Sequence, residues 1–247
     1  MPKLTTLAIP LKRQDYSESS QIVTFLTREY GKITAIAKGI RRPRKEFSGP
    51  IDLGADYRIS FYSRPSGHLQ ILAEAKLTAW HTAIRSDLKR FNAYLYLIEL
   101  ADAASRGIEA TTALFQLTVE TAAGLNSVDQ NRIRPLLDRF TLEILGYAGV
   151  APVLAACSSC GKTVEGTSIR VSAISGGVLC LSCDTVEIRA PSFNRGAILY
   201  LANLGKPGRT ASLSPPARWL RRETCEFFRY WLPIALDCEL KMLKHLY

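Results

Sequence analysis

The sequence lacks any run of eighteen apolar residues, so it predicts no helix that spans a membrane. Its first residues, MPKLTTLAIPLKRQ, are interrupted by Pro10 and end in charge, which is unlike a secretory signal. We therefore expect a cytoplasmic protein, and in that compartment thiols stay reduced. The six cysteines then favour metal or redox chemistry over a disulfide framework.

Histidine is scarce, and the few histidines have no evident carboxylate or nucleophile partner: His68, His81 and His245. No Walker loop, Gly-x-Gly-x-x-Gly or Gly-x-Ser-x-Gly motif is present. Four acidic residues of the helical segments are interpreted as solvent-facing charges: Asp87, Glu99, Asp102 and Glu143. The sequence therefore predicts a protein that is not an enzyme and has no catalytic residues.

Acidic residues are outnumbered, with 22 Asp and Glu against 32 Lys and Arg, a net charge of +10. The excess is densest in residues 1–80, which hold 13 basic and 7 acidic side chains. Such a surface attracts polyanions, either nucleic acid or anionic lipid. A basic protein that uses this charge only for solubility is the alternative.

Five positive charges and no acid fall within the eight residues 38–45. Gly39 and Pro43 interrupt this segment, so it is predicted to project as a loop. Basic residues on neighbouring predicted strands extend the surface. The candidate nucleic-acid contacts are Lys12, Arg13, Lys32, Lys38, Arg41, Arg42, Arg44 and Lys45. A solvated charge run is the competing interpretation.

Segments rich in β-branched and aromatic residues alternate with turn signals in the first 79 residues. They predict five strands at 6–11, 21–27, 32–40, 56–62 and 68–78. Five short strands suit a closed barrel of the OB type, although an SH3-like barrel fits the same pattern. The pattern does not decide which aromatics face outward for base stacking, among Tyr16, Phe25, Tyr30, Phe47, Tyr57, Phe61 and Tyr62.

From Trp80 the apolar residues recur at three- and four-residue steps, which is typical of amphipathic helices. Helices are expected at about 81–106, 110–125, 130–147, 192–204 and 216–246, the last kinked at Pro233. The fold class is therefore α+β, an N-terminal five-stranded OB-type β-barrel followed by an α-helical domain. The expected domains are 1–79 and 80–247, the second with a zinc-binding insert at about 150–190.

Two Cys-x-x-Cys pairs, Cys157 with Cys160 and Cys180 with Cys183, are separated by nineteen residues. This spacing is typical of a tetrahedral zinc site, and glycines beside each pair permit the tight turns it needs. Because four thiolates leave no open position, the sequence predicts one structural Zn²⁺. A redox-active pair needs only one Cys-x-x-Cys, and two disulfides are disfavoured in a reducing compartment. Cys225 and Cys238 are interpreted as small core residues.

Two stretches are specific enough to indicate a family. Residues 31–42 read Gly-Lys-Ile-Thr-Ala-Ile-Ala-Lys-Gly-Ile-Arg-Arg, and residues 176–183 read Gly-Gly-Val-Leu-Cys-Leu-Ser-Cys. With the order of the parts, they resemble the bacterial RecO family of recombination and repair mediators over nearly the whole chain. The resemblance implies an OB-fold domain, a helical domain and a zinc module within the latter. It assigns DNA contact to the family's basic strand and loop, which match Lys32, Lys38, Arg41, Arg42 and Arg44.

The same resemblance implies binding of single- and double-stranded DNA, annealing of complementary strands and a nucleoid-associated location. It also implies loading of the RecA recombinase onto DNA coated by single-strand-binding protein, with RecR and sometimes RecF as partners. The acidic tail of single-strand-binding protein ends in an apolar residue, so its pocket requires apolar lining and a cation. Arg132, Arg139 and Arg218 are three candidates for that cation.

Two other functions remain open at the level of sequence. One is an RNA-binding or translation-associated OB protein with a zinc ribbon. The other is a redox sensor whose thiolates release zinc on oxidation. The redox sensor ranks last, because no residue pattern near the cysteine pairs indicates exposure or activation.

Overall fold

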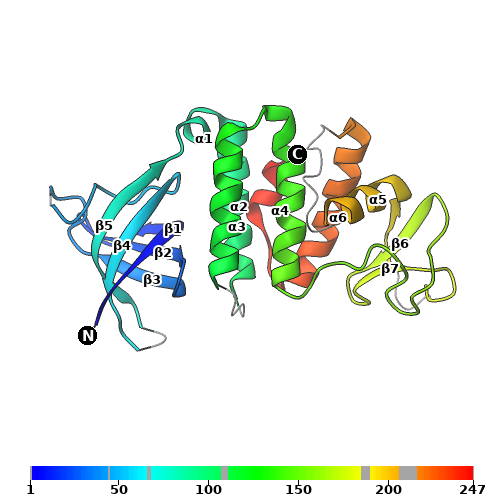
Figure 1. The fold of residues 1–247 in the computed structure, drawn as a ribbon, viewed down its shortest axis with the longest axis horizontal. Helices are drawn as coiled ribbons and strands as arrows, with labels where there is room; N and C mark the ends of the chain where they lie inside the picture. Colours follow the sequence, from blue (N-terminus) through cyan, green and yellow to red (C-terminus); the bar gives the residue numbers. More distant parts are fainter. Residues whose placement is uncertain are drawn as a thin grey trace. The chain divides into compact units, whose positions relative to one another are not determined.

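The computed structural model describes residues 2–43, 45–65, 68–106, 111–184, 190–205 and 216–246. The chain forms two compact units, Met1–Ser127 and Val128–Tyr247. The first contains five strands and three helices, and the second contains the remaining helices and a small sheet (Figure 1). Among the helices described, none has the length and apolar character required to cross a membrane.

The five strands of the first unit form a closed barrel in the order β1-β2-β3-β5-β4. Strand β1 pairs with both β2 and β4, which closes the sheet. Strands β3 and β5 pair in parallel, and every other pairing in the barrel is antiparallel. The strands are β1 (Lys3–Asp15), β2 (Gln21–Thr27), β3 (Gly31–Ala37), β4 (Ala55–Tyr62) and β5 (Gln70–Trp80). The prediction of five strands is confirmed.

Alternate residues of each strand point into the barrel, as the period of two requires. Phe25 of β2, Ala35 of β3 and Ile59 of β4 are fully buried there. The long segment between β3 and β4 adds Ile40 and Phe47 to the same core. These two side chains fix the segment that carries the basic residues at points seven residues apart.

Three helices complete the first unit: α1 (Thr82–Ser86), α2 (Leu88–Ala104) and α3 (Thr111–Ser127). The single helix expected at 81–106 is interrupted at Asp87, whose backbone is extended and whose side chain accepts a hydrogen bond from the Arg90 N–H. Asp87 is thus the N-cap of α2. Helix α2 packs on β1, and α3 packs on β2 and β3.

The second unit is built from helices and a three-stranded sheet of order β7-β6-β8. Its elements are η1 (Gln130–Arg132), α4 (Ile133–Tyr147), β6 (Ser168–Ser172), β7 (Gly177–Leu179), β8 (Ser192–Asn194), α5 (Arg195–Leu204), α6 (Arg218–Ala235) and η2 (Lys241–His245). The sequence pattern did not predict these three short strands. Residues 192–194, expected at the start of a helix, form β8 instead.

The expectation of one kinked helix over 216–246 is wrong. Helix α6 ends at Ala235, two residues after Pro233, and a separate 3₁₀ turn, η2, follows. Proline has no N–H to donate to the preceding turn, and Asp237 adopts a left-handed φ of 47° that ends the helical path.

The expected division into domains at residues 79 and 80 stays a prediction. The change from strand to helix does occur there, because β5 ends at Trp80 and α1 begins at Thr82. The two compact units, however, part between Ser127 and Val128.

Candidate zinc centre and nucleic-acid interface

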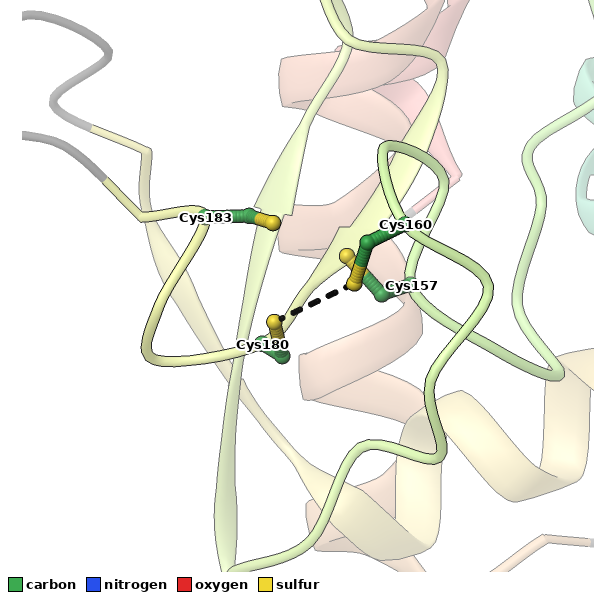
Figure 2. A group of neighbouring side chains, drawn as sticks. All are labelled: Cys157, Cys160, Cys180 and Cys183. Carbon is green, nitrogen blue, oxygen red and sulfur yellow. Dashed lines mark hydrogen bonds between the residues drawn. The ribbon is translucent and has the colours of Figure 1, made fainter.

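The four cysteines of the two pairs come together in the second unit, although the pairs are far apart in the chain. Their Sγ atoms all lie within 4.8 Å of one another, and Figure 2 shows them turned toward a common centre. The sulfurs of Cys160 and Cys180 are 3.6 Å apart. Tetrahedral zinc with bonds of about 2.3 Å requires sulfurs about 3.8 Å apart, so the spacing fits the ion. All six cysteines of the chain are free of disulfides.

Tight turns hold each pair in this arrangement. The Gly161 N–H donates to the Cys157 carbonyl over 2.8 Å, and the φ of 73° at Gly161 suits glycine. In the second pair, the Cys183 and Asp184 N–H groups both donate to the Cys180 carbonyl over 3.0 Å. The backbone of the two turns therefore aims all four sulfurs inward without help from distant side chains.

Thiols of the cluster differ in their pKa values. The Ser182 hydroxyl and the neighbouring thiols lower the pKa of Cys180 to about 6. Hydrogen bonds to Cys160 and Cys180 raise the pKa of Cys183 to about 12. Four thiolates this close together repel one another unless a cation neutralises them, and Zn²⁺ is the cation that this donor set prefers.

The cluster is only partly covered by protein. Cys157 is buried with Leu179 and Ala190, whereas Cys160 is exposed. The residues around the pairs gave no sequence signal for this exposure of Cys160. A metal held by all four sulfurs has no position left for a substrate, so the site suits a structural role.

The basic segment that follows β3 is a turn fixed to the barrel. Gly39 has a φ of 69°, and Ile40 is buried in the core. The Gly39 N–H donates to the Ser20 hydroxyl, and the Arg41 N–H donates to the Ser19 carbonyl, each over 3.3 Å. The turn between β3 and β4 thus lies against the β1–β2 loop, and its described basic side chains, Lys38, Arg41, Arg42 and Lys45, are exposed.

The eight candidate contacts do not form one uniform surface. Arg41 pairs with Asp15 at 2.6 Å, and the Arg13 guanidinium donates to the Ile51 carbonyl over 3.0 Å. Arg44 lies outside the described residues. Lys38, Arg42 and Lys45 are exposed, and within the described part of the chain they form no ion pair.

Lys12 and Lys32 both form ion pairs with one carboxylate, that of Asp102. Lys12 Nζ lies 2.5 Å from Asp102 Oδ2, and Lys32 Nζ lies 3.1 Å from Asp102 Oδ1. Asp102 is on α2 and is 5% exposed, so its interpretation as a solvent-facing charge is wrong. Sequence reasoning misplaced this residue, although its neighbours Leu100, Ala101, Ala103 and Ala104 are all apolar, which was the available signal.

Burial opposes ionisation of Asp102, but hydrogen bonds and charge from the two lysines outweigh it and lower the pKa of the carboxyl. Asp102 is therefore ionised at neutral pH and joins α2 to β1 and β3. The lysines act first as its counterions.

Of the candidate stacking aromatics, Phe25, Phe47, Tyr57 and Phe61 are buried in the barrel. Tyr16, Tyr30 and Tyr62 are exposed, by 64%, 42% and 39%. Tyr16 belongs to the β1–β2 loop, which contacts the basic turn through the Ser19 carbonyl and follows Asp15, the ion-pair partner of Arg41.

A groove of about 720 Å³ lies in the second unit between α4, α5 and the segment after α4. Its apolar lining includes Leu142, Tyr147, Pro152 and Leu201. Arg139 is at its edge and pairs with Glu143 at 2.5 Å. Of the three arginines considered for an acidic tail, Arg139 is the one that lines this groove.

Two family models match this chain in succession. The model described as "Recombination protein O N terminal" matches residues 1–80, and "Recombination protein O C terminal" matches residues 85–244. Curated relatives agree with them. "DNA repair protein RecO" of Anaeromyxobacter sp. (strain K) is 33% identical over 237 residues, covering 92% of this chain and 91% of the relative. The protein of the same name from Moorella thermoacetica is 30% identical over 191 residues, covering 77% and 70%.

Proposed function

Because this chain belongs to the recombination protein O family, we propose that it is a DNA repair and recombination mediator that acts without catalysis. It binds single- and double-stranded DNA, anneals complementary strands and, with RecR and sometimes RecF, helps to load RecA onto DNA coated by single-strand-binding protein. The observation that carries the proposal is the basic turn fixed to a closed barrel, with Lys38, Arg42 and Lys45 exposed.

The barrel is proposed to be of the OB class. The strand order β1-β2-β3-β5-β4, closed by β1 with β4 and parallel only between β3 and β5, supports this assignment over an SH3-like barrel. OB folds bind oligonucleotides across their sheet face and adjoining loops. Tyr16 is the stacking residue that best fits this surface, because it is exposed beside the basic turn.

Annealing requires no catalytic group. Two complementary strands repel each other as polyanions, and a basic surface that neutralises their phosphates lowers that barrier. Base pairing then provides the driving force. Zinc, held by Cys157, Cys160, Cys180 and Cys183, supports this activity only by stabilising the second unit.

The test is an annealing assay with complementary oligonucleotides and no ATP. We expect the wild-type chain to accelerate annealing and the Lys38→Glu/Arg42→Glu variant to lose most of that acceleration. The control is Glu46→Gln, an exposed substitution in the same segment. Unchanged annealing by the double variant would overturn the assignment of the basic turn. Equal binding of RNA and DNA without annealing would instead support an RNA-binding protein.

The groove beside Arg139 is proposed to bind the acidic, apolar-ended tail of single-strand-binding protein. Its apolar lining suits the terminal side chain, and Arg139 suits the carboxylate. We expect Arg139→Ala to weaken binding of a fluorescent tail peptide about tenfold, the loss of one charge-assisted hydrogen bond. Arg132→Ala is the control, because Arg132 does not line the groove. Equal affinity of both variants would contradict this placement.

A further inference from the structure

Helix α6 of the second unit carries its positive charge at its N-terminal end. Arg218, Arg221 and Arg222 are all exposed within its first five residues, which contain no acid. Cations at this end of a helix oppose the macrodipole, and neighbouring cations also repel one another. The arrangement is therefore unfavourable for the isolated protein and becomes favourable when an anion is bound.

The nearby acids do not neutralise these arginines. Glu223 accepts a hydrogen bond from the Asn194 N–H over 3.1 Å, and Glu226 pairs with Arg229 at 3.0 Å. Across the residues that the structure describes, no ion pair involves Arg218, Arg221 or Arg222. The charge of these side chains is thus available to a partner.

An aromatic side chain lies in the same first turn of α6 as these arginines and packs against α5. Trp219 is 51% exposed, and its ring lies over Gly196 at the start of α5. A Cβ at Gly196 would be 2.9 Å from Trp219 Cη2, so the absence of a side chain there makes room for the indole. Arg195, also exposed, precedes this glycine and adds a fourth cation.

We propose that Arg195, Arg218, Arg221, Arg222 and Trp219, the α6 patch, form a second binding surface for single-stranded nucleic acid. Arginines neutralise phosphates, and a half-exposed indole of fixed orientation stacks on a base. A single strand fits better than a duplex, because only unpaired bases offer their faces for stacking. The choice of ligand class rests on the proposed function, whereas the location does not.

The patch adds a surface for single strands on the second unit to the barrel surface on the first unit. Each complementary strand then has its own binding site before pairing begins.

The test compares full-length Arg218→Gln/Arg222→Gln with wild type by fluorescence anisotropy of a labelled oligothymidylate at several salt concentrations. Removing two phosphate contacts should lower the slope of log K against log[salt] by about 1.4, since each contact contributes about 0.7 on single strands. Arg229→Gln is the matched control on the same helix. The substituted arginines are exposed, so the thermal midpoint should stay equal or rise as the unfavourable charge is removed.

A second readout follows the indole itself. In a Trp80→Phe background, the remaining tryptophans are Trp219 and the buried Trp231. Oligothymidylate should quench the fluorescence of this protein, and Trp219→Phe should abolish the quenching while leaving the fold intact.

Three outcomes are distinguishable. A reduced slope and lost quenching support the α6 patch. If wild type binds and Lys38→Glu/Arg42→Glu weakens binding, but the α6 variants behave as wild type, the patch is overturned and the proposed function stands. If wild type does not bind the oligonucleotide, the proposed function and the patch both fail.

Discussion

The Asp102 carboxylate receives Lys12 from β1 and Lys32 from β3, so one side chain of α2 joins two strands of the barrel. A buried carboxylate is costly unless it is paired, and here both of its oxygens have a cation. These two ion pairs therefore form a structural connection between the helix and the barrel. Among the described residues, the exposed cations of the basic turn, Lys38, Arg42 and Lys45, form no ion pair of this kind.

Substituting Asp102 by Asn should destabilise the protein by roughly 1–3 kcal/mol at pH 7, because two lysines lose their counterion. The pKa of Asp102 is lowered in the folded state, so its contribution is present above the unfolded value of about 3.9 and is lost as pH falls through the folded pKa. Urea unfolding at pH 7, 5 and 3 should show the difference from wild type shrinking at pH 3. A pH-independent difference would contradict the ionic explanation.

Removing the charge of Lys32 should affect mainly stability, whereas removing the charge of Arg42 should affect mainly DNA binding. Lys32→Gln loses the ion pair with Asp102. Its main effect should therefore be a lower urea midpoint, with only a small loss of DNA affinity. Arg42→Gln should leave the midpoint unchanged and reduce the salt slope of single-strand binding by about 0.7. Unfolding and anisotropy titrations of both variants check this. An equal loss of affinity in both would mean that Lys32 also contacts DNA.

At the scale of elements, the zinc-site segment depends on a close approach between β7 and the chain after α4. Val153 and Gly177 form an isolated bridge, in which the Val178 N–H donates to the Val153 carbonyl over 2.9 Å. A Cβ on Gly177 would lie 2.2 Å from that carbonyl oxygen. Gly177 is the first residue of β7 and lies three residues before Cys180. The bridge therefore positions the second cysteine pair.

Gly177→Ala should therefore cost about 2 kcal/mol, since the added methyl group must displace backbone. Gly146→Ala is the matched control, because Gly146 is in α4 and a Cβ there meets nothing within 4 Å. That variant should gain about 0.5–1 kcal/mol from the helix preference of alanine. Denaturant unfolding compares them, and equal effects of the two variants would refute the close approach as the cause.

At the scale of the whole molecule, the cysteine cluster and the basic turn belong to different units. The cluster lies in Val128–Tyr247 and the basic turn lies in Met1–Ser127. Metal binding to a four-thiolate site contributes directly to folding, because the unfolded chain has no preformed site. Loss of the metal should therefore lower the stability of the protein before it lowers the affinity for DNA.

Removal of zinc by a chelator should lower the Tm by roughly 10 °C, which corresponds to a loss of about 3 kcal/mol in a chain of this size. Binding to the barrel surface at 25 °C should change less than twofold while the protein stays folded. Calorimetry, anisotropy and metal analysis on the same sample check both effects, with one zinc per chain expected before treatment. Cys160→Ser should reproduce the loss of Tm, and an unchanged Tm in both cases would argue against a structural metal.

The sequence alone determined what depends on short-range patterns. The two Cys-x-x-Cys pairs, the alternation in the five barrel strands and the density of charge at residues 38–45 each act over a few residues, so their consequences are local. Helix ends follow less directly from the periodic pattern, because a single cap such as Asp87 or a proline such as Pro233 decides them.

Tertiary structure decided what depends on residues distant in the chain. Asp102 meets Lys12 and Lys32 across 90 and 70 residues, and only the packing of α2 on the barrel brings them together. Because of this packing, Lys12 and Lys32 are counterions of Asp102, whereas other cations of the same charge, such as Lys38 and Arg42, are exposed. Trp219 packs against Gly196 of another helix, since close contact between elements depends on the three-dimensional path of the backbone.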